Sequence, residues 1–124
     1  MKTQLTAEES AKLIELGVSP ERASERTPDY TDINNTGRPL ERRELLPVFT
    51  LGNILDILPK FVPDAGGDLS YALKIQPCNL PGWQVCYYAY SLDNGKGYQA
   101  SPELIDALYS LLVWCLEKGH VKLN

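Results

Sequence analysis

Histidine, cysteine and methionine are scarce in this chain, and their scarcity limits the chemistry that the sequence supports. Among 124 residues there are one histidine, three cysteines and one methionine. The single histidine, His120, lies near the C-terminal end, so no Ser-His-Asp arrangement can be argued and a cysteine nucleophile has only this base. Cys78 and Cys86 form no C-x-x-C pair, which makes them weak zinc ligands with His120. We therefore expect no catalytic residue, no metal site and no cofactor.

A long apolar run and an excess of positive charge are also lacking. The apolar stretch at residues 104–116 contains Asp106 and is shorter than the roughly 20 residues of a spanning helix. The first 20 residues show no apolar run, so we expect no secretory signal. A net charge of −4 disfavours nucleic-acid binding, because phosphate contacts need cations. Three cysteines without framework spacing fit a reducing compartment. These features predict a cytoplasmic protein without membrane attachment.

The strongest local pattern lies at residues 101–119. Ser101 is a suitable N-cap, Pro102 suits the first helical position, and Gly119 can take the left-handed stop. Apolar residues between these signals recur at helical spacing nearly all round the helix. The pattern predicts a mostly buried helix. With 44% apolar and 23% charged residues, the chain has the composition of a single globular domain, residues 1–124.

The N-terminal part predicts a pair of helices followed by a polar loop. Thr6 and Glu9 match a capping box for a helix at residues 5–16, which Gly17 ends. Ser19 and Pro20 then favour a short second helix to residue 25. Residues 26–44 are polar and rich in turn formers, which is typical of a loop or tether. Thr50 is a suitable N-cap for a third helix, which is expected at residues 51–58.

The pattern then changes to the two-residue period of strands. Alternation predicts strands at residues 69–76 and 83–92, with a turn at residues 63–68 before the first. Asn94-Gly95 is a strong hairpin signal, and a short third strand at residues 97–100 follows. The tail at residues 120–124 is a candidate edge strand. The fold class is therefore α+β: an antiparallel meander of about three strands at residues 45–124, packed on helices, with the N-terminal helix pair at residues 1–25.

The outward face of the second strand carries the most informative residues. If Trp83, Val85 and Tyr87 face the core, then Gln84, Cys86, Tyr88 and Tyr90 face away from it, and Tyr98 lies across the hairpin. Tyrosine supplies contact area at low entropy cost, which is typical of recognition surfaces. We therefore take Tyr88, Tyr90, Tyr98 and Gln84 as a candidate partner surface. The alternative is that the N-terminal helices fold back and cover this face.

Two weaker motifs have plain structural alternatives. Residues 13–25 contain the Leu-Gly-Val-Ser step of a helix-turn-helix, but Pro28 limits the second helix to about two turns, too short for a DNA reader. An αα-corner is the simpler interpretation. Asp64 and Asp68 flank two glycines, but their spacing does not match a calcium-binding EF-hand loop, and a solvated turn is favoured.

The order of these segments also resembles a group of known proteins. The residues that carry the likeness are LIELGVSPERA, FTLGNILDILP, WQVCYYAY and SPELIDALYSLLVWCLEKG. In this order they resemble small uncharacterised proteins of gut Bacteroidetes genomes and their prophages or mobile elements. The resemblance implies a cytoplasmic protein of unknown function, of phage or mobile-element origin, and it transfers no catalytic motif.

Together these observations favour a small non-enzymatic protein-interaction module. It would bind a protein partner, or itself as a homo-oligomer, through the tyrosine-bearing face. One alternative is a small-molecule-binding domain or small enzyme with a pocket between sheet and helices. Another, less favoured, is weak DNA binding by the N-terminal helices. The sequence itself fixes neither the partner nor the oligomeric state.

Overall fold

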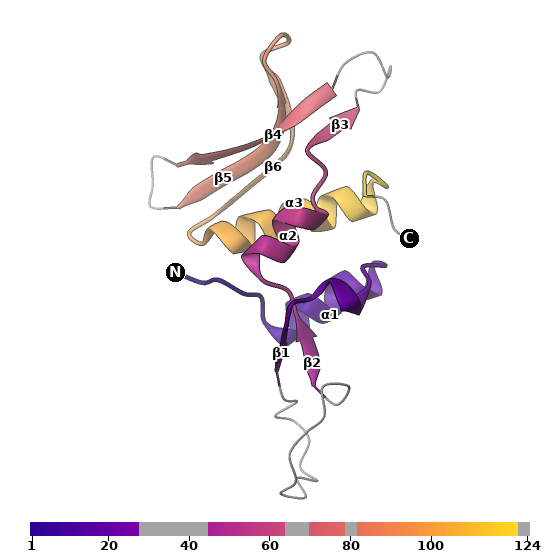
Figure 1. Ribbon diagram of the computed structural model, residues 1–124. Coiled ribbons are helices and arrows are strands. Elements are labelled where there is room, and N and C mark those ends of the chain that lie inside the picture. Colours follow the sequence, from indigo (N-terminus) through magenta and orange to yellow (C-terminus); the bar gives the residue numbers. More distant parts are fainter. Residues whose placement is uncertain (28–44, 64–69, 79–81, 122–124) are drawn as a thin grey trace, which may run out of the picture.

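The chain forms helices and antiparallel sheets, as the α+β prediction requires. The computed structural model describes residues 1–27, 45–63, 70–78 and 82–121 (Figure 1). The elements follow in the order α1 (Ala7–Glu15), the 3-10 turn η1 (Pro20–Arg22), β1 (Glu25–Thr27), β2 (Leu46–Val48), α2 (Leu51–Ile57), β3 (Phe61–Pro63), β4 (Ser70–Pro77), β5 (Trp83–Ala89), β6 (Asn94–Ser101) and α3 (Leu104–Glu117).

The strands form two sheets rather than one meander of three strands. β1 and β2 pair with each other, and the larger sheet has the order β3-β4-β5-β6, with every neighbouring pair antiparallel. The sequence patterns predicted neither β1 nor β2, and in the larger sheet they did not predict β3. β3 is only three residues long and ends in Pro63, so it is too short to show a two-residue period and carries a residue that disfavours strands.

The predicted N-terminal helix pair is wrong in its second member. α1 forms with the expected capping box, in which Thr6 Oγ1 accepts from the Glu9 N–H and Glu9 accepts from the Thr6 N–H. The second helix is a single 3-10 turn, because Ala23 takes an extended backbone after it. The chain then enters β1, where Pro28 restricts its neighbour Thr27 to extended geometry. Arg26 and Thr27 are therefore strand residues and do not begin the polar loop.

The hairpin between β5 and β6 turns earlier than predicted. Residues 90–93 form the turn, and Asp93 takes the left-handed conformation at φ 47°. Asn94 and Gly95 already belong to β6, where they pair with Ala89 and Tyr88. The predicted Asn-Gly turn is therefore wrong. β5 ends at Ala89 instead of residue 92, and β6 is longer than the predicted 97–100.

α3 confirms the predicted buried helix, although its start differs. Ser101 ends β6, and Glu103 occupies the N-cap without a side-chain hydrogen bond of its own to the helix. Ser101 Oγ accepts from the Glu103 N–H at 3.3 Å, so it supports the residue before the helix. Gly119 takes φ 74° just after the helix and its N–H bonds to the Leu116 carbonyl, which is the expected stop.

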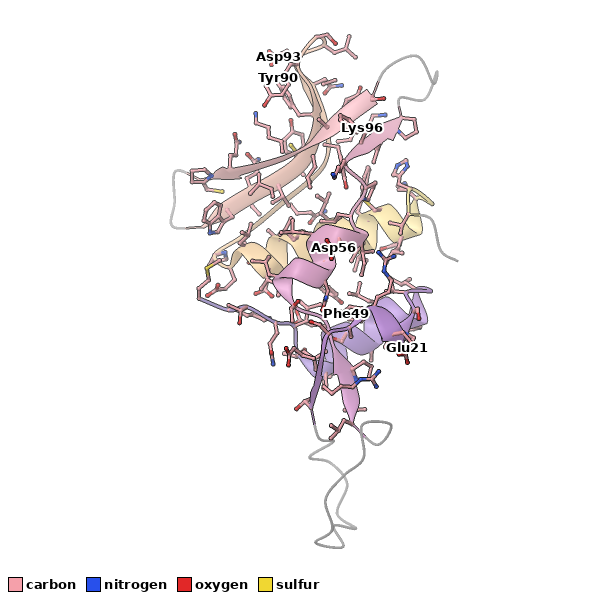
Figure 2. All side chains as sticks on the ribbon, viewed as in Figure 1. Glu21, Phe49, Asp56, Tyr90, Asp93 and Lys96 are labelled. Atoms are coloured by element: carbon pink, nitrogen blue, oxygen red, sulfur yellow. The ribbon has the colours of Figure 1, made fainter. Side chains whose placement is uncertain are left out.

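The core lies between the larger sheet and the helices. α3 packs against β5 and β6, α2 packs against α3, and α1 contacts β2. In Figure 1 the two helices α2 and α3 lie between the larger sheet and α1. Figure 2 shows Phe49, which is fully buried, among these helices. The buried hydroxyl of Ser10 accepts from the Phe49 N–H at 3.1 Å and so satisfies a donor inside the core.

An ion cluster fixes the start of the chain beside the helices. Lys2 Nζ lies 2.9 Å from Glu9 and 2.6 Å from Asp106, which joins the N-terminal segment to α1 and α3. Burial lowers the pKa of Lys2, but hydrogen bonds to Asp106 and Glu9 raise it by more, so the net pKa lies above its ordinary value. The ammonium therefore stays charged and holds both carboxylates.

Some predictions fall outside the described residues. These are most of the polar loop after Thr27, the turn before β4 with Asp64 and Asp68, Leu69, and residues 122–124 of the predicted edge strand. Within the described ranges, no helix is both long enough and apolar enough to cross a membrane.

Candidate interaction surface

The larger sheet has an inner face toward α3 and an outer face on the other side. The inner residues of β5 are Val85, Tyr87 and Ala89, and each is at most 4% exposed, as the alternation predicted. Trp114 of α3 stacks on Tyr87 with ring centroids 6.3 Å apart. The residues that alternate with Val85, Tyr87 and Ala89 along β5 therefore project from the outer face, where Figure 1 shows no described helix.

Tyr88 and Tyr90 meet on the outer face and share one cation. Their rings lie edge to face with centroids 4.8 Å apart. Lys74 projects from the neighbouring strand β4, and its Nζ lies 4.2 Å from the Tyr88 ring centroid and 5.4 Å from that of Tyr90. Aromatic faces attract an ammonium through their quadrupole. The three side chains therefore form one packed cluster, although Tyr90 is 71% exposed.

Asp93 anchors this cluster from the hairpin turn. The Tyr88 hydroxyl donates to the Asp93 carboxylate. This hydrogen bond stabilises the neutral phenol, and with desolvation and the nearby negative charge it raises the pKa of Tyr88 to about 12. Figure 2 shows Tyr90 and Asp93 at the tip of the β5–β6 hairpin, away from α3. The hydroxyl of Tyr88 is thus protonated over the physiological range and fixed in direction.

A β-bulge places Tyr98 on the same face. Val85 pairs with Gln99 and Tyr87 pairs with Lys96, so Gly97 and Tyr98 together stand opposite one residue of β5. In a regular strand, Tyr98 would share the face of Lys96; the extra residue reverses this. A Cβ on Gly95 would lie 2.7 Å from Cζ of Tyr98, so the tyrosine ring lies over the bare backbone of Gly95. Tyr98 is 51% exposed.

Phe61 extends the surface across the sheet, and the sequence analysis missed it. Phe61 pairs with Ala72, Ala72 pairs with Tyr88, and Tyr88 pairs with Gly95, so these positions form one row across all four strands. Phe61 is 62% exposed, whereas its neighbour Val62 is buried. We call Phe61, Tyr88, Tyr90 and Tyr98 the aromatic patch. The only sequence signal for Phe61 was a large apolar residue between two prolines.

Gln84 and Cys86 occupy the outer face beside the patch. The Gln76 side-chain amide donates to Oε1 of Gln84 at 2.6 Å, so Gln84 belongs to a cross-strand pair and is partly buried. Cys86 is only 2% exposed, with Lys74 opposite on β4 and Tyr98 opposite on β6. Burial raises the pKa of the Cys86 thiol, which keeps it neutral. Gln84 and Cys86 therefore support the patch and add little contact area.

The N-terminal segment docks away from the outer face. Besides the Lys2 ion cluster, the Leu5 N–H bonds to the Phe49 carbonyl and the Leu51 N–H bonds to the Thr3 carbonyl. These bonds place residues 2–5 beside β2 and α2, on the far side of α3 from the aromatic patch (Figure 1). The alternative in which the N-terminal helices cover the tyrosines does not hold for the described residues.

The described residues give no support to the weaker site hypotheses. In the ranges that the structure describes, no group of three His, Cys, Asp or Glu side chains is placed to hold a metal ion. Cys115 is fully buried, and burial raises the pKa of its thiol to about 11, which is unfavourable for a nucleophile. The three-residue η1 replaces the second helix that a helix-turn-helix reader needs.

Comparison of the chain with known proteins gives no match to a family model, to a curated protein or to a solved structure. The resemblance to small proteins of gut Bacteroidetes genomes and mobile elements therefore stays a prediction.

Proposed function

We propose that this chain is a non-enzymatic protein-interaction module that binds a protein partner through the aromatic patch. The observation that carries the proposal is the exposure of three large aromatic side chains, of which Phe61 and Tyr98 lie on the outer face of the sheet and Tyr90 lies in its hairpin turn against Tyr88. Scattered apolar residues are ordinary on a protein surface, but a contiguous group is typical of an interaction site.

The order within the patch supports binding. Tyr88 is fixed by Asp93 and Lys74, and Tyr90 packs against Tyr88. Side chains that are already positioned lose little conformational entropy when a partner docks, so more of the contact energy contributes to affinity.

The edges of the larger sheet carry features that discourage pairing, whereas its outer face exposes aromatic side chains. The edge strand β6 carries the bulge at Gly97 and a lysine, and the edge strand β3 has three residues and a proline. Short strands, bulges, lysine and proline are the features by which natural sheets avoid unwanted pairing. Edges with these features beside an exposed aromatic patch favour recognition through the face and not through strand addition.

A capture experiment with matched variants tests the proposal. The tagged chain is used to bind proteins from nuclease-treated lysate, and the bound proteins are identified by mass spectrometry. We expect Tyr88→Ser/Tyr90→Ser to lose the proteins that the wild type retains, because the central cluster is removed. Leu55→Ser is the control, since Leu55 is an exposed apolar residue of α2, 40% exposed and outside the patch. If the double variant folds and retains the same proteins, the proposal is wrong.

A further inference from the structure

The charge of the outer face differs from that of the whole chain. Among the described residues of this face and its hairpin turn, the charged side chains are Lys74 and Asp93, and their two charges cancel. The chain as a whole carries a net charge of −4. A partner that is selected by its own net charge would need a surface of the opposite sign, which the described part of this face does not offer.

A neutral face with one cation and one anion is, however, complementary to itself. In a two-fold symmetric contact the same patch is present on both sides, so each charge must find its opposite on an identical surface. Lys74 lies over the ring of Tyr88 and Asp93 accepts from its hydroxyl, so the two charges lie on different sides of one side chain. Rotation about an axis near this tyrosine brings Lys74 of one copy toward Asp93 of the other.

The area of the patch is also compatible with a modest dimer. Phe61, Tyr90 and Tyr98 are 62%, 71% and 51% exposed. At about 200 Å² per aromatic side chain, they present roughly 370 Å² of surface. A standard interface buries about 800 Å² on each partner. The three rings supply nearly half, and the half-buried Tyr88, Lys74 and Gln76 around them add to it, which predicts a weak dimer.

We propose that the partner of the aromatic patch is a second copy of this chain, packed face to face about a two-fold axis. The inference rests on the proposed function, because it assigns an occupant to the same surface. The edge features of β3 and β6 disfavour a continuous sheet as the mode of pairing, so the inferred contact is made by side chains of the two outer faces.

Sedimentation velocity on the full chain, from micromolar to sub-millimolar concentration, tests the inference. We expect the weight-average mass to rise from 13.8 kDa toward twice that value with concentration. Tyr90→Ser/Tyr98→Ser should remain at the monomer mass, and Leu55→Ser should associate as the wild type does. Lys74→Glu is a second variant that leaves all four aromatic residues in place. It gives the face two negative charges, and we expect it to weaken association at least tenfold at low salt.

The outcomes separate this inference from the proposed function. A wild type that stays monomeric at every concentration, or a dimer that survives both Tyr90→Ser/Tyr98→Ser and Lys74→Glu, overturns the second-copy inference. If the wild type is monomeric but the capture experiment still loses proteins on Tyr88→Ser/Tyr90→Ser, the partner is a different protein and the proposed function stands. If neither experiment responds to the patch variants, both are wrong.

Discussion

Tyr87 and Tyr88 are neighbours in β5, yet they belong to opposite faces of the sheet and do different things. Tyr87 is fully buried, stacks on Trp114 and donates to the Pro59 carbonyl at 2.7 Å. Tyr88 lies at the surface, packs on Tyr90 and donates to Asp93. The pKa of Tyr87 is raised chiefly by burial, whereas that of Tyr88 is raised chiefly by its hydrogen bond to Asp93. The same residue type therefore stabilises the core on one face and belongs to the exposed aromatic patch on the other.

The largest expected effect on stability comes from Gly97→Ala, which disturbs packing on the inner face at the bulge. Gly97 has φ +68°, and a Cβ there would lie 2.9 Å from the Trp114 ring. Gly97→Ala combines a strained backbone with overpacking, and we expect it to lower the free energy of unfolding by about 3 kcal/mol. Urea unfolding followed by circular dichroism measures this.

Gly52→Ala is the matched control for that substitution. The nearest atom to a Cβ at Gly52 is Thr50 Oγ1 at 3.8 Å, and the residue lies in α2. Alanine favours the helix, so we expect a gain of about 0.5 kcal/mol. An equal loss in both variants would show that the packing of Trp114 on Gly97 is not important.

Removing one hydroxyl from each face gives the next largest effect. Tyr87→Phe leaves the Pro59 carbonyl without its donor in a partly buried place, and we expect a loss of about 1–2 kcal/mol. Tyr88→Phe removes a hydroxyl that water can replace, so the unfolding midpoint should not change measurably. Equal midpoints for the two variants would contradict the contrast between the faces.

The smallest effect concerns titration and not stability. Asp93→Asn removes the carboxylate that accepts from Tyr88, so the pKa of Tyr88 should fall from about 12 toward the ordinary value of about 10. The absorbance of the phenolate follows this titration, and Tyr88→Phe identifies the component that belongs to Tyr88. Asparagine tolerates the left-handed conformation of residue 93, so the turn is retained. An unchanged titration would mean that the hydrogen bond does not determine this pKa.

The sequence predicted those features that depend on regular spacing. Alternation placed Val85 and Tyr87 in the core and Tyr88 outside, and the capping signals at Thr6 and Thr50 marked real helix starts. These predictions succeed because burial imposes the period of the element on the sequence.

The sequence could not predict features that depend on contacts distant along the chain. β1 and β3 are three residues each, and their pairing with partners elsewhere defines them as strands. Lys74 lies within the predicted strand 69–76, but its place over Tyr88 follows from the register of β4 and β5. The turn at Asp93 replaced the favoured Asn-Gly turn because pairing of Asn94 with Ala89 extends β6. Tertiary pairing thus decided each of these points.

The bulge at Gly97 and Tyr98 also has a consequence for how this protein can change in evolution. Because two residues share one position opposite Cys86, the bulge shifts the alternation along β6 by one residue, while the pairing with β5 keeps its faces on both sides of the bulge. Loss of the Gly97 codon would leave Tyr98 on the outer face and Gln99 on the inner face. A length difference of one residue among relatives at this point would therefore preserve the aromatic patch, whereas the same deletion elsewhere in β6 would reverse the two faces beyond it.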